Sequence, residues 1–326
     1  MALYPFRFTP VYKDYLWGGR SLERLGRALP PGIVAESWEI SAHPDGVSVI
    51  CNGPLAGLTL PEVLEGNGED VLGRDVDPVF REKFPLLVKL IDAQQPLSVQ
   101  VHPDDHFART YEGETYGKTE MWYIMAAEPE AEIICGLLPG VTADRFAAAL
   151  AEGTLETCLY FRKVSVGDVI LIPAGTVHGL GKGIVLAEIQ QNSNVTYRVY
   201  DYRRKDGDGR ERLLHIDKAM RVINFSPADP ACFSHPEPEA TAPGQAKAVV
   251  AKTPYFTVEL MIGEGAWTEC ADGSRFILYT FIAGTANIDY DGGGLRVDIP
   301  ESLLIPAALG EYTLKGSFKA LKTYVS

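Results

Sequence analysis

Apolar and polar residues alternate along residues 98–102 (SVQVH), in the middle of the first half of the chain. Alternation with a period of two is typical of a β-strand, and it places Ser98, Gln100 and His102 on one face. The two valines then point into apolar packing. The pattern therefore predicts a strand that presents an amide and an imidazole side chain to the same space.

Residues 118–122 (KTEMW) show the same alternation, with Lys118, Glu120 and Trp122 on one face. If the two strands are adjacent, they direct Gln100, His102, Lys118 and Glu120 into one cavity. Imidazole nitrogen and carboxylate oxygen together form a ligand set for Zn²⁺ or a similar divalent metal. The alternative is a pair of half-buried strands with polar outer faces.

A third segment, residues 167–178 (GDVILIPAGTVH), begins with a turn, continues as an apolar strand, and ends in a tight turn at Pro173 and Gly175 that leads to His178. Its spacing, Gly-x5-Pro-x-Gly-x2-His, resembles the second motif of the cupin superfamily of small β-barrels, although Lys182 replaces the final Asn. The first cupin motif is degenerate, because Gln100 stands in place of its first His and Glu120 lies farther away than usual. The resemblance implies a metal held by His102, Glu120 and His178.

Longer segments resemble one cupin family, the type I mannose-6-phosphate isomerases. The matching segments are residues 85–93, 95–103, 118–120, 173–178 and 188–198, and residues 17–19 and 36–44 are similar to its shorter bacterial branch. The resemblance implies an isomerase that interconverts mannose 6-phosphate and fructose 6-phosphate through an enediol, with one zinc ion per chain and a sugar phosphate as its partner.

The same resemblance implies roles for individual residues. His102, Glu120 and His178 are the expected metal ligands, and Gln100 is a weaker one because a neutral amide oxygen binds a cation less strongly. Either Glu188 or Lys118 is the general base, and Arg198 is a fixed cation that stabilises the enediolate or holds the phosphate. We expect Lys89, Ser98 and Trp17 to contact the substrate. Many relatives have Asp where this chain has Asn194.

Charge and composition limit the other classes of function. The formal net charge of −13 argues against nucleic acid and anionic membranes as partners, because both require a basic surface. An anionic substrate then needs local positive charge, which Lys89, Lys118, Arg198 and a metal would supply. The 5 cysteines are scattered, without a C-x-x-C motif, which is typical of reduced thiols. No basic leader or long apolar run is present, so we expect a cytoplasmic protein.

The order of short strands predicts a mainly β protein made of two cupin-like jelly-roll barrels. We expect a metal-bearing catalytic domain over residues 1–225, with a small helical insertion near residues 142–160 in which Thr142 begins a helix and Gly153 ends it. The proline-rich residues 226–245 form the expected linker, and residues 246–326 form a metal-free jelly roll.

Alternatives remain at three levels. The protein could be a non-catalytic sugar-binding or regulatory cupin, or a cupin oxygenase with iron at the same ligands. Lys89 could lie in solvent on an edge strand rather than in the cavity. Arg198 could be a structural residue that pairs with a carboxylate.

Overall fold

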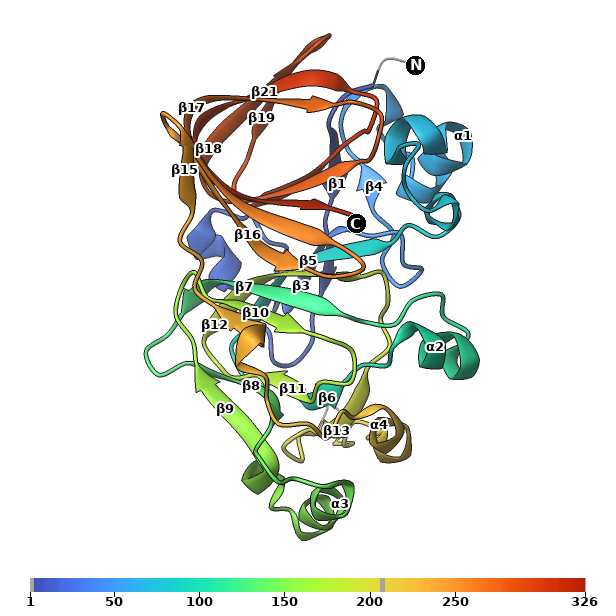
Figure 1. Cartoon of the computed structure of the whole chain (residues 1–326), viewed down its shortest axis with the longest axis vertical. Helices are drawn as coiled ribbons and strands as arrows, with labels where there is room; N and C mark the ends of the chain where they lie inside the picture. Colours follow the sequence, from blue (N-terminus) through green and yellow to red (C-terminus); the bar gives the residue numbers. More distant parts are fainter. Residues whose placement is uncertain (1–2, 206–208, 326) are drawn as a thin grey trace.

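The computed structural model describes residues 3–205 and 209–325. This part of the chain is mainly β, as predicted, and its strands form three antiparallel sheets. A nine-stranded sheet occupies one end of the molecule, and the other two sheets lie beside one another in the remaining part (Figure 1).

The nine-stranded sheet has the order β15-β16-β17-β21-β18-β20-β1-β4, with β19 beside β18. Its strands are β1 (Phe6–Thr9), β4 (Val49–Ile50), β15 (Glu239–Ala242), β16 (Gln245–Lys252), β17 (Thr257–Ala271), β18 (Ile277–Tyr290), β19 (Gly293–Val297), β20 (Glu301–Ile305) and β21 (Gly310–Tyr324). Strand β1 pairs with β20, with Phe6 opposite Leu304. The first strand of the chain therefore completes a sheet built mainly from its last third.

The seven-stranded sheet has the order β14-β10-β7-β12-β5-β3-β2. Its strands are β2 (Val11–Lys13), β3 (Glu36–Ile40), β5 (Leu86–Ala93), β7 (Glu120–Ala127), β10 (Val169–Ile172), β12 (Ile184–Gln191) and β14 (Phe233–Ser234). Strand β5 lies between β12 and β3, and all of its residues are buried. Its nearly continuous apolar sequence suits a strand covered on both faces.

The five-stranded sheet has the order β13-β6-β11-β8-β9. Its strands are β6 (Val99–Val101), β8 (Glu132–Leu137), β9 (Leu159–Lys163), β11 (His178–Leu180) and β13 (Tyr197–Tyr200). One apolar cluster joins it to the seven-stranded sheet, since Ile133 and Leu180 pack in the same cluster as Trp122 and Ile172. The two sheets thus form a sandwich, and the candidate site lies between them.

Helices are few and lie outside the sheets (Figure 1). They are α1 (Leu60–Leu72), α2 (Asp105–Phe107), α3 (Ala143–Glu152) and α4 (Ile216–Val222), with short turns η1 (Ser21–Leu25), η2 (Gly53–Leu55), η3 (Pro78–Arg81), η4 (Ala108–Glu112), η5 (Leu155–Cys158) and η6 (Pro230–Cys232). The predicted ends of α3 are confirmed: the Thr142 hydroxyl accepts the Arg145 N–H at 3.2 Å, and Gly153 has a φ of 71°. Within the described ranges, none of the helices has the length and apolar character needed to span a membrane.

The proline-rich segment 226–245 contains two short strands. Strand β14 pairs with β10 of the seven-stranded sheet, and β15 pairs with β16 of the nine-stranded sheet. The chain therefore passes from one sheet to the other between these strands. The division into residues 1–225 and 246–326 stays a prediction.

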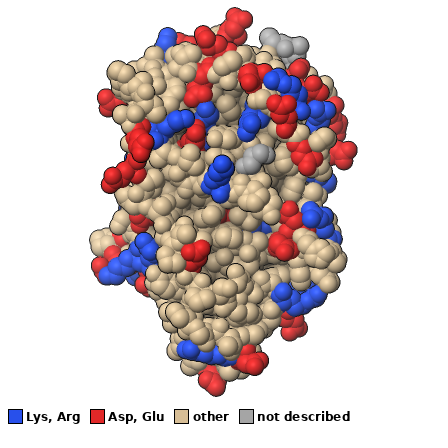
Figure 2. Space-filling model, in the orientation of Figure 1, with Lys and Arg blue, Asp and Glu red and all other residues tan. Residues whose placement is uncertain are grey.

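Charged side chains of both signs are interspersed on the face shown in Figure 2, where lysines and arginines lie close to acidic residues. On this face the cations do not gather into one basic field. The arrangement agrees with the acidic composition of the chain.

Candidate metal centre and active site

Strand register brings four site residues of the seven-stranded sheet into one row. On β12, Glu188 lies opposite Lys89 of β5 on one side and opposite Trp122 of β7 on the other. On β5, Lys89 lies opposite Trp38 of β3. Because residues directly opposite one another in antiparallel strands point to the same face, these side chains all reach the space between the sheets.

A second row crosses the five-stranded sheet. Gln100 of β6 lies opposite His178 of β11 and opposite Arg198 of β13. His102 follows directly after β6, on the face that alternation predicts for Gln100. On β13, Tyr197 and Val199 are buried while Arg198 and Tyr200 are partly exposed, which is the alternation of a strand with one buried face.

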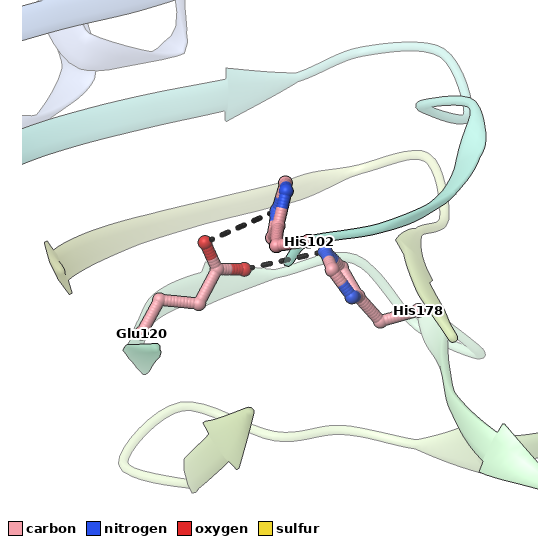
Figure 3. A group of neighbouring side chains, drawn as sticks. All are labelled: His102, Glu120 and His178. Carbon is pink, nitrogen blue, oxygen red and sulfur yellow. Dashed lines mark ion pairs between the residues drawn. The ribbon is translucent and has the colours of Figure 1, made fainter. Parts of the chain in front are cut away.

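His102, Glu120 and His178 converge between the sheets (Figure 3). Nε2 of His102 lies 3.5 Å from one oxygen of Glu120, and Nε2 of His178 lies 3.3 Å from the other. The ligand atoms of the three residues lie within 4.8 Å of one another, and all three side chains are buried. The structure therefore brings together the three residues that the resemblance implies as metal ligands, and their role as ligands stays a prediction.

Backbone hydrogen bonds orient both imidazoles. Nδ1 of His102 lies 2.8 Å from the Val195 carbonyl oxygen, and Nδ1 of His178 lies 2.8 Å from that of Thr176. A carbonyl can only accept, so each Nδ1 carries the proton and each Nε2 keeps a lone pair directed at the cluster. Burial lowers the pKa of His178 to about 4. Burial, followed by the charge of Lys118, lowers the pKa of His102 well below its usual value. Both imidazoles are therefore neutral ligands at neutral pH.

Glu120 shows that the cluster fits a cation. Both of its carboxylate oxygens are buried, and the Lys118 ammonium lies 2.6 Å from one of them. Burial, together with the charge of Glu188, raises the pKa of Glu120 to about 7. A buried carboxylate requires positive charge beside it, and together with the two neutral imidazole nitrogens it forms a typical metal-binding set.

Gln100 and Lys118 border the cluster. Nε2 of Gln100 lies 3.2 Å from Nε2 of His178, and rotation of the amide by half a turn would present its oxygen instead. The Lys118 ammonium lies 2.6 Å from Glu120 and 3.1 Å from Nε2 of His102. The predicted strand around Lys118 was too long, however, because β7 begins only at Glu120. The backbone N–H of Lys118 donates to the Pro103 carbonyl instead of a neighbouring strand.

Lys89 is paired inside the protein. Its ammonium lies 3.2 Å from Glu188 and 3.5 Å from Glu36, and it also stands over the Trp38 ring at 5.0 Å. The alternative of a solvated edge strand is wrong, because β5 has a partner on each side and Lys89 is only 3% exposed. Burial alone would lower the pKa of Lys89, but the charges of Glu36 and Glu188 outweigh burial and raise it.

Glu188 is held in its ionised form. The Trp122 indole N–H donates to one of its oxygens at 2.8 Å. Burial would raise the pKa of Glu188, but the charges of Lys118 and Lys89 outweigh burial and lower the pKa to about 2. Glu188 thus links the two lysines of the site.

Replacing Lys89 by Met should destabilise the protein by about 3–5 kcal/mol, because it leaves buried carboxylates without their cation. The folded pKa of Glu188, about 2, lies below its ordinary value of 4.5, so its stabilising effect is present above pH 4.5 and is lost as the pH falls towards 2. The penalty of Lys89→Met should therefore shrink in acid. Urea denaturation at several pH values measures both effects.

Lys13 provides the matched control, because its ammonium also stands over the Trp38 ring, at 4.6 Å, but on a partly exposed residue. Lys13→Met should cost no more than about 1 kcal/mol, the range of exposed charge pairs. Equal losses for the two variants would contradict the assignment of Lys89 as the counter-ion of the buried carboxylates.

A cavity of about 220 Å³ opens above the metal-binding cluster. Its lining includes every predicted substrate-binding and catalytic residue, namely Trp17, Lys89, Ser98, Lys118, Glu188 and Arg198, as well as Gln100 and Asn194. His102, Glu120 and His178 lie beneath this surface and are contacted by Gln100 and Lys118. The sequence reasoning missed Tyr15, Glu36, Thr196 and Arg212. Of these, Glu36 had a signal, since it begins the segment 36–44.

Arg198 has no carboxylate within 4.0 Å among the described residues. Nη1 of its guanidinium donates to the Leu213 carbonyl at 3.0 Å, while Nε is buried and has no hydrogen-bond partner in that part of the chain. The structural alternative for Arg198, pairing with a carboxylate, therefore has no support in these contacts.

Comparisons with known proteins agree with this geometry. Residues 5–142 match the model of the catalytic domain of type I phosphomannose isomerases. The chain is 38% identical over 318 residues to the probable mannose-6-phosphate isomerase GmuF of Bacillus subtilis, covering 96% of this chain and 97% of that protein. It is 35% identical to the mannose-6-phosphate isomerase ManA of the same organism over the full length of both. A crystal structure of the Bacillus subtilis mannose 6-phosphate isomerase aligns with a TM-score of 0.90 and 33% identity, covering 98% of this chain and 99% of that one.

The antiparallel sandwich, with a His–Glu–His group held between its sheets, defines a cupin with a candidate metal centre. Sequence identity along nearly the whole chain then identifies one family within the cupins. The chain belongs to the type I mannose-6-phosphate isomerase family.

Proposed function

We propose that this chain is a zinc-dependent aldose–ketose isomerase that interconverts mannose 6-phosphate and fructose 6-phosphate, as the names of its relatives indicate for them. The observation that carries the proposal is the convergence of Lys118, Glu188 and Arg198 in one cavity directly above the His–Glu–His cluster. A protein that only binds sugar has no need for this set of proton-transferring and charge-stabilising groups.

His102, Glu120 and His178 would hold the metal, and Gln100 could add an amide oxygen. Two nitrogen donors and one carboxylate suit zinc, with a position left for substrate or water. When bound, the ion acts as a Lewis acid towards oxygens of the sugar.

The reaction moves a hydrogen between C2 and C1, so a general base has to accept a carbon-bound proton. Glu188 with a pKa of about 2 is a weak proton acceptor at neutral pH, so we assign this step to Lys118, which would act as the neutral amine. Glu188 then holds the two lysines in place. Arg198 supplies a fixed positive charge near the negative charge that develops on the enediolate oxygen.

Asn194, which stands where many relatives have Asp, lies beside a carboxylate. Its Nδ2 donates to the carboxylate of Asp45 at 2.7 Å. A carboxylate is therefore present at this place although residue 194 is an amide. Any role that relatives give to an aspartate at that position would fall to Asp45 together with Asn194.

The charges of the site suit a phosphorylated sugar. With Lys118 as the neutral amine that a proton acceptor must be, two cations (Lys89 and Arg198) face three carboxylates (Glu36, Glu120 and Glu188). A divalent metal then leaves about one positive charge for a phosphate that carries a charge near −2 at neutral pH. The cavity is thus cationic in a protein whose net charge is −13.

The zinc-loaded protein should convert fructose 6-phosphate to mannose 6-phosphate, as followed by NMR of the sugar carbons. Lys118→Met should abolish turnover while sugar phosphate still binds, because it removes the proton acceptor and leaves the shape of the side chain. Binding of fructose 6-phosphate to the wild-type protein without turnover would instead identify a sugar-binding protein.

A further inference from the structure

Arg212 lies where two hollows of the protein meet. It lines the 220 Å³ active-site cavity and also a neighbouring hollow of about 320 Å³, and among the described residues the two share Tyr15 and Trp17 besides it. The inner cavity alone is smaller than the roughly 300–1,000 Å³ of typical small-molecule sites. A sugar phosphate that outgrows this cavity would extend towards the junction, where Arg212 lies.

A buried carboxylate fixes Arg212. Nε of Arg212 donates to Oδ2 of Asp201 at 2.7 Å, and Nη2 donates to Oδ1 of the same group. The side chain of Asp201 is only 5% exposed, and it also accepts from Arg204. This two-point contact holds the guanidinium in one plane, so its orientation is set before any ligand arrives.

The segment that carries Arg212 is also fastened to the strand that carries Arg198. Arg198 donates from Nη1 to the Leu213 carbonyl at 3.0 Å, and the His215 N–H donates to the Arg198 carbonyl at 2.8 Å. The positions of the two arginines in the cavity lining therefore depend on each other.

Arg212 retains hydrogen-bonding capacity for a ligand. Within residues 3–205 and 209–325, its Nη1 has no hydrogen-bond partner. Arg204 and Arg212 together exceed Asp201 by one positive charge, next to the charge of Arg198. Burial lowers the pKa of Arg198, and the positive charges of Arg212 and Arg204 lower it further. An anion bound at the junction would relieve this repulsion.

We propose that Arg212, held by Asp201, binds the phosphate group of the substrate at the outer end of the active-site cavity and makes the enzyme selective for phosphorylated sugars. The proposal rests on the proposed function and adds a residue to it. A planar guanidinium matches a phosphate with two parallel N–H donors, which a lysine cannot reproduce. Asp201 is a positioning residue, because it acts through Arg212.

Arg212→Ala should raise KM for fructose 6-phosphate about 10- to 100-fold, the effect of one charge-assisted hydrogen bond, and change kcat much less. Inhibition by inorganic phosphate should weaken by a similar factor. The ratio of kcat/KM for fructose 6-phosphate to that for unphosphorylated fructose should fall. A loss confined to kcat, or unchanged inhibition by phosphate, would overturn the proposal.

Arg7 is the matched control, because it forms a comparable arginine–carboxylate pair with Glu301, at 2.8 Å and 23% exposure, outside the cavity lining. Arg7→Ala should leave KM and phosphate inhibition unchanged even if it lowers the melting temperature. An equal rise in KM for Arg7→Ala would show that the effect reflects general destabilisation.

Asp201→Asn tests the positioning role. It should raise KM less than Arg212→Ala does, since the cation remains but loses its fixed orientation. The double variant should show no larger rise in KM than Arg212→Ala alone, because residues that act through one another are not additive. Additive effects would contradict the role of Asp201.

Calorimetric titration with inorganic phosphate and with fructose 6-phosphate separates this proposal from the proposed function. If the wild-type protein lacks isomerase activity but binds both ligands through Arg212, the proposed reaction fails and the phosphate site remains. If turnover is normal and both ligands bind Arg212→Ala as tightly as the wild type, the phosphate site fails and the reaction stands.

Discussion

His102→Ala should yield a folded protein that has lost its metal and, with it, all measurable isomerase turnover. The reason lies in the geometry, since Nε2 of His102 is one of three buried ligand atoms and its orientation is fixed by the Val195 carbonyl. Loss of a hydrogen bond that merely supports a ligand costs about 10–100-fold in metal affinity. Loss of the ligand itself should cost more. Elemental analysis after dialysis measures the bound metal directly.

In the wild-type protein, chelation of the metal should abolish activity, and added zinc should restore it. The metal should also stabilise the fold, by about 2.7 kcal/mol when free zinc exceeds its dissociation constant 100-fold. Glu120→Gln should lose most of this stabilisation, because a neutral amide replaces the carboxylate at nearly the same volume.

His43 supplies the control for both measurements. It is buried like His102, but its Nδ1 accepts the backbone N–H of Asp45 and it lies outside the metal-binding cluster. His43→Ala should keep a full complement of metal whatever it does to stability. Full metal content in His102→Ala would show that the ligand set is wrong.

The residues of the cluster were predictable because two sequence motifs imply them by resemblance and short-range rules orient their side chains. A period of two placed Gln100 and His102 on one face, and a Pro-Gly turn marked the approach to His178. The place of Arg198 in the site was implied by the resemblance, and alternation along β13 agrees with it. In each case the direction of a side chain depends on neighbours within a few residues, and these are visible in the sequence.

The partners of these residues were not predictable, because they depend on strand order. Lys89 plainly needed a counter-charge, but nothing in the sequence named Glu36 and Glu188, which reach it from the strands on either side. The pairing of β1 with β20 joins Phe6 to Leu304, which are 298 positions apart in the sequence. Arg212 was missed for a similar reason, since its place depends on a buried contact with Asp201 rather than on a periodic pattern.

Arg198→Ala should keep its metal and its fold while kcat falls by roughly 10²–10³, the usual cost of removing a donor that stabilises a developing oxyanion. Three observations support a role in the reaction: the side chain lines the cavity, lacks a carboxylate partner among the described residues, and is held by the Leu213 carbonyl. Arg198→Lys should recover only part of the rate, because a point charge cannot reproduce the planar guanidinium.

Steady-state kinetics of Arg198→Ala and Arg212→Ala, measured side by side, distinguish the roles of the two arginines. If Arg198 faces the enediolate and Arg212 faces the phosphate, the first variant loses kcat and the second loses affinity. A loss in Arg198→Ala that lies almost wholly in KM would make Arg198 a phosphate anchor as well. Unchanged kinetics with a lower melting temperature would make it structural. One backbone segment supports both side chains, because it carries Arg212, which Asp201 holds, and it supplies the Leu213 carbonyl that holds Arg198. The split between kcat and KM is therefore the measurement that separates the roles of the two arginines.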